Sequence, residues 1–257
     1  MSGKEMLKKR IIPIELYDCG RLIKTKNFMH PRDVGNPAKS SQVYSDQDAD
    51  ELILLNIARD RSFPAQFVQI VSQIAKNCYV PLTVGGGIQT KIQALSLFEA
   101  GADKIVLNSQ AYENPGLITE IARDLGKQAI IVGIDVKKNG NNVYSCLSDC
   151  SRRMENISLI NHVQRVIEAG AGELIIQSID NDGMMNGYDL ELLSFLIERS
   201  SVPIIIAGGA GNFMDLLKAF QIGASGAACG SLFNFGDNNP LRAKAFLKNY
   251  NIPLKLV

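Results

Sequence analysis

The chain has 257 residues, of which 46% are hydrophobic and 21% are charged. A length near 250 residues is typical of a single (βα)8 barrel, so we expect one domain over residues 1–257. The 27 basic and 26 acidic residues nearly cancel in charge, and this balance argues against a nucleic-acid partner and against binding to an anionic membrane surface.

Segments that would direct the chain to a membrane or an oxidising compartment are not evident in the sequence. No apolar run is long enough to cross a bilayer, and the basic first residues lack the apolar stretch of a signal peptide. The five cysteines show no disulfide spacing, and Cys146 and Cys150 have no nearby histidine that would complete a metal site. We therefore expect a reduced, cytoplasmic location, with no metal ion and no cofactor.

Eight short apolar segments, rich in β-branched residues, predict strands in chain order. They cover residues 10–16, 51–57, 81–86, 104–109, 129–135, 173–180, 203–209 and 227–231. Between most of them lie segments with apolar residues at helical spacing and a closing glycine, such as 90–102 and 212–224. Strands of this kind, separated by helices, form a parallel sheet covered on its outer face. The α/β fold class with a (βα)8 barrel is the main prediction, and an open doubly wound sheet is the alternative.

An internal repeat supports the barrel. Residues 81–109 align without a gap on residues 203–231, an offset of 203 − 81 = 122, and the same offset pairs Glu51 with Glu173. The pattern predicts two half-barrels, about 8–125 and 126–250, in which a site in one half has a counterpart in the other.

Two sets of small residues follow equivalent strands of the two halves and predict two phosphate sites. They are Gly86, Gly87, Asn108 and Ser109 in the first half, and Gly208, Gly209, Gly230 and Ser231 in the second. Glycine lets backbone N–H groups approach an anion closely, and the loops after strands seven and eight of such barrels often bind phosphate. The alternative is that the glycines only permit tight turns.

Carboxylates at strand ends are candidates for acid–base chemistry. Asp135 ends the fifth strand, where we place it between the two phosphate sites, and Asp180 and Asp182 follow the sixth. Asp182 precedes Gly183, so a turn-capping role is an alternative for it. At the position of the first strand equivalent to Asp135 the chain has Leu16, which cannot exchange a proton.

Four charged residues stand at strand starts, which form the opposite end of a barrel. They are Arg10, Glu51, Lys104 and Glu173. Two cations and two anions at one pole could compensate one another as a closed ring that gates the barrel axis, although each alone could be an ordinary surface charge.

Segments such as KKRIIP, DELILLNI, PLTVGGGI, GADKIVLNS and SIDNDGMMNG resemble the cyclase subunit (HisF family) of imidazole glycerol-phosphate synthase along nearly the whole chain. The resemblance implies a half-barrel-duplicated (βα)8 lyase of histidine biosynthesis. It also implies a glutaminase (HisH-type) partner beneath the barrel and ammonia passing through the axis to a bisphosphorylated nucleotide. By position it implies that Asp135 and Leu16 occupy the catalytic pair, that the four charges form the gate, and that Asp103 contacts the glutaminase. It also implies that phosphate is bound by Gly86, Asn108, Ser109, Gly208, Gly209, Gly230 and Ser231. Lys24, Asp182 and Gly183 then join the substrate site.

The sequence departs from this family at the mouth of the barrel. Besides Leu16, the departures are Asn56, Gln177, Met184 and Ala207. We therefore favour a divergent paralogue with impaired cyclisation that supplies ammonia for another amidation, such as that of a surface sugar. One alternative is an authentic cyclase in which Glu15 or Asp18 replaces the missing acid. The other is a non-catalytic activator of the glutaminase.

Overall fold

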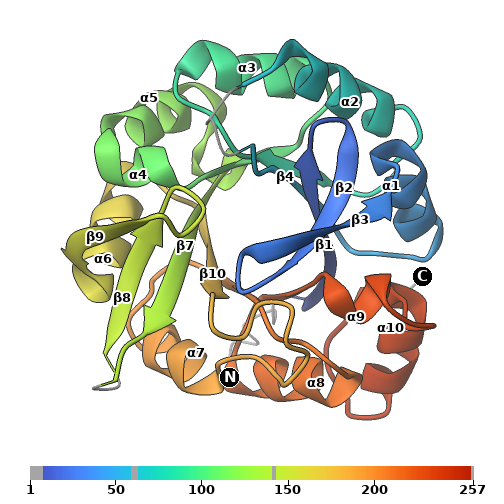
Figure 1. The fold of residues 1–257 in the computed structure, drawn as a ribbon. Helices are drawn as coiled ribbons and strands as arrows, with labels where there is room; N and C mark the ends of the chain where they lie inside the picture. Colours follow the sequence, from blue (N-terminus) through green and yellow to red (C-terminus); the bar gives the residue numbers. More distant parts are fainter. Residues whose placement is uncertain (1–7, 59–62, 141–142, 256–257) are drawn as a thin grey trace, which may run out of the picture.

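The computed structural model describes residues 8–58, 63–140 and 143–255 and contains a closed barrel of parallel strands (Figure 1). Its wall consists of β1 (Arg10–Asp18), β4 (Leu52–Asn56), β5 (Leu82–Gly85), β6 (Lys104–Leu107), β7 (Ile130–Lys138), β10 (Glu173–Ser178), β11 (Ile204–Ala207) and β12 (Gly226–Cys229). Neighbouring strands pair in parallel around this wall, and β12 pairs with β1 to close it. The expected (βα)8 barrel is confirmed.

Helices form a ring outside the barrel (Figure 1). They are α1 (Pro37–Asp46), α2 (Ala65–Ala75), α3 (Lys91–Glu99), α4 (Ser109–Glu113), α5 (Gly116–Leu125), the 3-10 helix η1 (Lys127–Ala129), α6 (Leu159–Ala169), α7 (Leu190–Ile197), α8 (Phe213–Ile222), α9 (Ser231–Asn234) and α10 (Pro240–Lys248). Equivalent capping boxes begin α3 at Thr90 and α8 at Asn212, and these residues lie 212 − 90 = 122 positions apart. The repeat in sequence is thus accompanied by a repeat in local hydrogen bonding.

Two antiparallel hairpins were not predicted from the sequence. They consist of β2 (Arg21–Lys26) with β3 (Met29–Gly35), and of β8 (Tyr144–Ser148) with β9 (Arg153–Ser158). The prediction that the first strand ends at residue 16 and runs into a loop is wrong, because β1 continues to Asp18 and pairs with β2. In Figure 1 the β2–β3 hairpin, in blue, extends across the opening of the barrel.

The hydrophobic core has two layers, one inside the barrel and one between barrel and helices. The inner layer is aliphatic and consists of Ile12, Ile14, Ile53, Val106, Ile131, Ile175, Ile205, Ala207 and Ala228, with Leu55 packed against it. The larger outer layer holds the helices on the strands. Within the described ranges, every helix is too short or too polar to cross a membrane.

Glu15 is a carboxylate buried in the outer layer. Successive residues of a strand point to opposite faces, so Glu15 lies outside the barrel wall and Leu16 inside it. The Glu15 side chain is 3% exposed, and its Oε2 accepts a hydrogen bond from Ser41 Oγ of α1 at 2.8 Å. Burial raises the pKa of Glu15 to about 7, although hydrogen bonds from Ser40 and Ser41 oppose the shift.

We expect Glu15→Gln to stabilise the protein at pH 8 but not at pH 4. The folded pKa lies above the unfolded value, so the native protein loses stability as pH rises from about 4.5 to about 7, while the amide variant does not. The gain at pH 8 should be roughly 1–3 kcal/mol. Urea unfolding at several pH values measures this gain, with Glu120→Gln at an exposed position of α5 as the control. A difference that does not change with pH would contradict the assignment.

Candidate active site

Tight backbone packing explains the first glycine of each pair. A Cβ at Gly86 would lie 1.8 Å from the backbone oxygen of Asn56, and a Cβ at Gly208 would lie 2.6 Å from that of Ser178. Both glycines also have positive φ, of 93° and 85°. Asn56 and Ser178 are themselves 178 − 56 = 122 residues apart, so the two turns are equivalent in the two halves.

The first set of predicted residues lines a cavity at the mouth of the barrel. Its wall includes Gly86, Gly87, Asn108, Ser109, Leu16, Asp18, Asn56, Asp135 and Gln177. Asn108 Nδ2 donates a hydrogen bond to Asp135 Oδ2 at 2.9 Å. Burial raises the pKa of Asp135 to about 7; the bond from Asn108 lowers it and the charge of Asp182 adds to the rise. Near neutral pH this carboxyl can therefore both donate and accept a proton.

The second set lines a smaller neighbouring cavity. Its wall includes Gly208, Gly209, Gly230, Ser231, Lys24, Asp182, Gly183 and Ala207. Lys24 reaches it from β2, since a Cβ at Gly230 would lie 2.6 Å from Lys24 Nζ. The buried Ser231 Oγ has no hydrogen-bond partner among the described residues. A cation, a free hydroxyl and glycine backbone in one small cavity suit an anionic group.

Asp182 joins the hairpin to the loop after β10. It is 2% exposed, and its carboxylate accepts hydrogen bonds from Thr25 Oγ1 at 3.0 Å and Gln177 Nε2 at 3.3 Å. Lys24 Nζ lies 3.6 Å away as an ion pair. Asp180 has a different place, because its carboxylate accepts from the backbone N–H of Lys138 at 2.9 Å and it lines neither cavity.

The structure corrects the expected position of Asp135. Asp135 does not end its strand, because β7 continues to Lys138, and it lines only the first cavity, whereas Leu16 and Gln177 line both cavities. The β2–β3 hairpin crosses the opening and contributes Ile23 to the first wall and Lys24 to the second. The mouth is thereby divided into two unequal parts.

The structure also separates the two proposed substitutes for the missing acid. Glu15 lies on the outer face of β1 against Ser41, so its suggested role at the mouth is wrong. Asp18, an even number of residues from Leu16, lines the first cavity together with Asp135. Asp18 is therefore the one of the two that could act there.

The second hairpin supplies residues that sequence reasoning missed. Asp149 and Cys150, at the β8–β9 turn, line the first cavity, and Asp149 N–H donates to Ser109 Oγ at 3.2 Å. Asp149, Cys150 and Ser151 have consecutive positive φ values of 55°, 54° and 64°. The sequence signal was the polar run SDCS between two alternating segments, which is typical of a turn.

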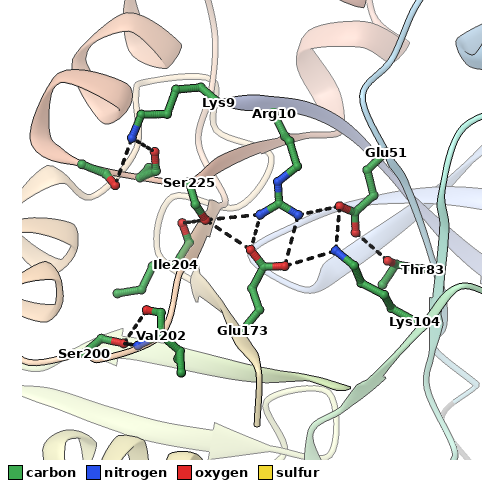
Figure 2. A network of polar contacts seen from close by, with 12 residues as sticks. Lys9, Arg10, Glu51, Thr83, Lys104, Glu173, Ser200, Val202, Ile204 and Ser225 are labelled. Carbon is green, nitrogen blue, oxygen red and sulfur yellow. Dashed lines mark hydrogen bonds and ion pairs between the residues drawn. The ribbon is translucent and has the colours of Figure 1, made fainter. Parts of the chain in front are cut away.

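At the opposite end of the barrel the four charged residues form a closed network (Figure 2). Arg10 bonds Glu51 at 2.6 Å and also bonds Glu173, and Lys104 Nζ lies 3.1 Å from Glu51 and 3.4 Å from Glu173. Thr83 Oγ1 donates to Glu51 at 2.6 Å. We call Arg10, Glu51, Lys104 and Glu173 the charged ring. Each cation contacts both anions, which offsets the cost of removing these charges from water.

Asp103 lies beside the charged ring. Its side chain is exposed, and its Oδ2 accepts a hydrogen bond from the backbone N–H of Leu82 at 2.8 Å. It precedes Lys104 at the start of β6. Asp103 therefore belongs to the bottom face, where a docked protein could reach it.

Fold and site together define the chain as a (βα)8-barrel protein with two glycine-bounded cavities at the carboxyl ends of its strands and a charged ring at their amino ends. The sequence model of the family described as Histidine biosynthesis protein matches residues 11–239. Proteins called Imidazole glycerol phosphate synthase subunit HisF are similar over the whole chain: that of Dictyoglomus turgidum is 38% identical over 98% of this chain and 100% of its own length, and that of Alkaliphilus metalliredigens is 35% identical over 97% and 100%. The chain belongs to this family, as a HisF-type cyclase subunit.

We expect phosphate binding to weaken strongly when an acid is placed in the second cavity. Ser231→Asp and Gly209→Asp each place a carboxylate in the wall of the cavity that Lys24 also lines, and at Gly209 a Cβ would also lie 2.1 Å from the backbone oxygen of Gly187. Calorimetric titration of phosphate should show at least roughly tenfold lower affinity for both variants. Ser200→Asp, on the loop after α7, is the control. Unchanged affinity in both variants would remove the anion site.

Proposed function

We propose that this chain is the synthase subunit of an imidazole glycerol-phosphate synthase-like glutamine amidotransferase complex. A glutaminase subunit docks on the bottom face, near Asp103, and releases ammonia below the charged ring. Ammonia passes along the aliphatic interior to a phosphorylated ligand at the mouth. The observation that carries this proposal is the placement of a closed charged ring at one end of the barrel and of a cavity suited to an anionic group at the other.

The chemistry at the mouth favours a divergent paralogue. Asp135 is an acid–base group in the first cavity, and Leu16 supplies an apolar surface where its partner would stand. A cyclisation that needs two proton transfers on opposite sides of a ring is impaired by this replacement. Ammonia would then serve another amidation, such as that of a surface sugar, with the ligand still held through phosphate.

An authentic imidazole glycerol-phosphate cyclase of histidine biosynthesis is the second candidate. Its support is Asp18, which lines the same cavity as Asp135 and could act as the second acid–base group. The relatives named above carry this activity in their names. The two candidates differ in the rate expected with the histidine-pathway nucleotide.

The partnership is tested with the glutaminase subunit encoded in the same genome. We expect the two purified proteins to associate at micromolar concentration, with an association rate that falls as salt screens the charged bottom face. We also expect the glutaminase to hydrolyse glutamine at least roughly tenfold faster in the complex. Analytical ultracentrifugation and glutamate release measure both effects. The control is Asp103→Lys, which should weaken association and leave the barrel folded. If native proteins do not associate, or associate without a change in rate, the proposal fails.

A further inference from the structure

The β2–β3 hairpin presents chemically different faces to the two sides of the mouth. Toward the first cavity it places Ile23, Phe28 and Pro31. On the other side Lys24 of β2 is paired in register with Arg32 of β3, so these two side chains share one face. The hairpin therefore presents an apolar face to the first cavity and a cationic face to the other side.

The cationic face borders a groove that continues from the second cavity. The groove is lined by Lys24, Lys26, His30, Arg32, Met184 and Phe235, among others, and none of the described residues in its lining is acidic. Lys24, Gly183, Met185 and Ser231 line both the cavity and the groove, which makes the two continuous. An anion in the second cavity thus has an open route toward further positive charge.

Two cations of the groove have no acidic partner among the residues that the structure describes. Lys26 and Arg32 are exposed and form no ion pair with any residue that the structure describes, whereas Arg21 on the same hairpin is paired with Asp33. Lys24 lies 3.6 Å from Asp182 as an ion pair. The buried Ser231 Oγ, without a partner in the described part of the chain, lies where cavity and groove meet. A cluster of like charges around an unsatisfied hydroxyl is a site prepared for an anion larger than one phosphate.

We propose that the second cavity and the groove together bind a diphosphate ester. One phosphate lies against Gly209, Gly230 and Ser231, and the next lies in the groove between Lys26 and Arg32. The organic group attached to it lies against Phe235 and Met184, which are 48% and 46% exposed. This inference rests on the proposed function and deepens it by naming a ligand class for the second cavity at the same mouth.

The test compares inorganic phosphate with pyrophosphate by calorimetry. For the native protein we expect pyrophosphate to bind at least roughly tenfold more tightly than phosphate. The double variant Lys26→Gln with Arg32→Gln should bring the two affinities within about twofold, while phosphate itself binds as in the native protein. Lys137→Gln, an exposed lysine on β7, makes the same change in charge outside the groove and should keep the preference.

The outcomes separate the inference from the proposal on which it rests. If native protein binds phosphate and pyrophosphate equally, or if the double variant keeps the preference, the diphosphate site is wrong and the phosphate cavity stands. If neither anion binds to the folded native protein, the cavity assignment and the diphosphate site fail together. Thermal unfolding of each variant shows whether the hairpin change has disturbed the fold.

Discussion

Leu16→Asp is expected to raise the rate of imidazole formation from the bisphosphorylated nucleotide and ammonium salt by roughly 10²- to 10⁴-fold. Leu16 is 8% exposed and lines the same cavity as Asp135, so the new carboxylate would face the ligand across that cavity. The gain arises because the second proton transfer then has a group to perform it. The introduced carboxylate and Asp135 would also raise each other's pKa, which favours one protonated and one ionised member near neutral pH.

The measurement is the initial rate of product formation with saturating ammonium, so that no glutaminase is needed. Leu16→Asn is the matched control, since it has the same shape as the aspartate variant but cannot transfer a proton. A native rate that is already high and is lost in Asp135→Asn would contradict the paralogue proposal. In that case Asp18→Asn shows whether Asp18 is the second group.

Lys104→Ala is expected to leave the barrel folded but to uncouple glutamine hydrolysis from ammonia use in the assembled complex. Arg10 bonds both glutamates without help from Lys104, so the two anions remain paired in the variant. The ring then lacks one side, and water and ions can enter where a closed ring hindered them. We expect the amount of ammonia that reaches the acceptor, per glutamine hydrolysed, to fall at least roughly tenfold in this variant.

Glu173→Ala is a different change because it leaves cations without a partner. Arg10 and Lys104 would then share Glu51 alone, and Ser225 would lose a carboxylate that it contacts at 3.2 Å. Breaking a buried pair in this way costs about 3–5 kcal/mol of folding stability, so this variant tests stability more than ammonia passage.

For Lys104→Ala the control is Lys127→Ala, an exposed lysine just before β7. If the folded Lys104→Ala complex uses as much ammonia per glutamine hydrolysed as the native complex, the charged ring does not control ammonia passage.

Local patterns in the sequence were enough to predict the barrel and the equivalence of its halves. Apolar strands that alternate with helical segments, helix caps and glycines at the ends of strands are short-range signals. Each of them depends on a few neighbouring residues. The 122-residue offset pairs Gly86 with Gly208 from the sequence alone, and the structure shows the same tight packing at both glycines. Charges that directly precede apolar strands must lie at one end of a closed barrel, so the ring could also be anticipated.

Tertiary structure decided how the mouth is divided. Thr25 and Asp182 are 157 positions apart in the chain, and Asp149 lies over Ser109 from a hairpin 40 positions away. No local pattern specifies such contacts, because they depend on where two hairpins pack after the barrel has closed. The same packing sends Lys24 to Gly230 and points Glu15 away from the mouth while Leu16 faces it. Sequence therefore determined which residues stand at the ends of the strands, and long-range packing determined which of them share a cavity.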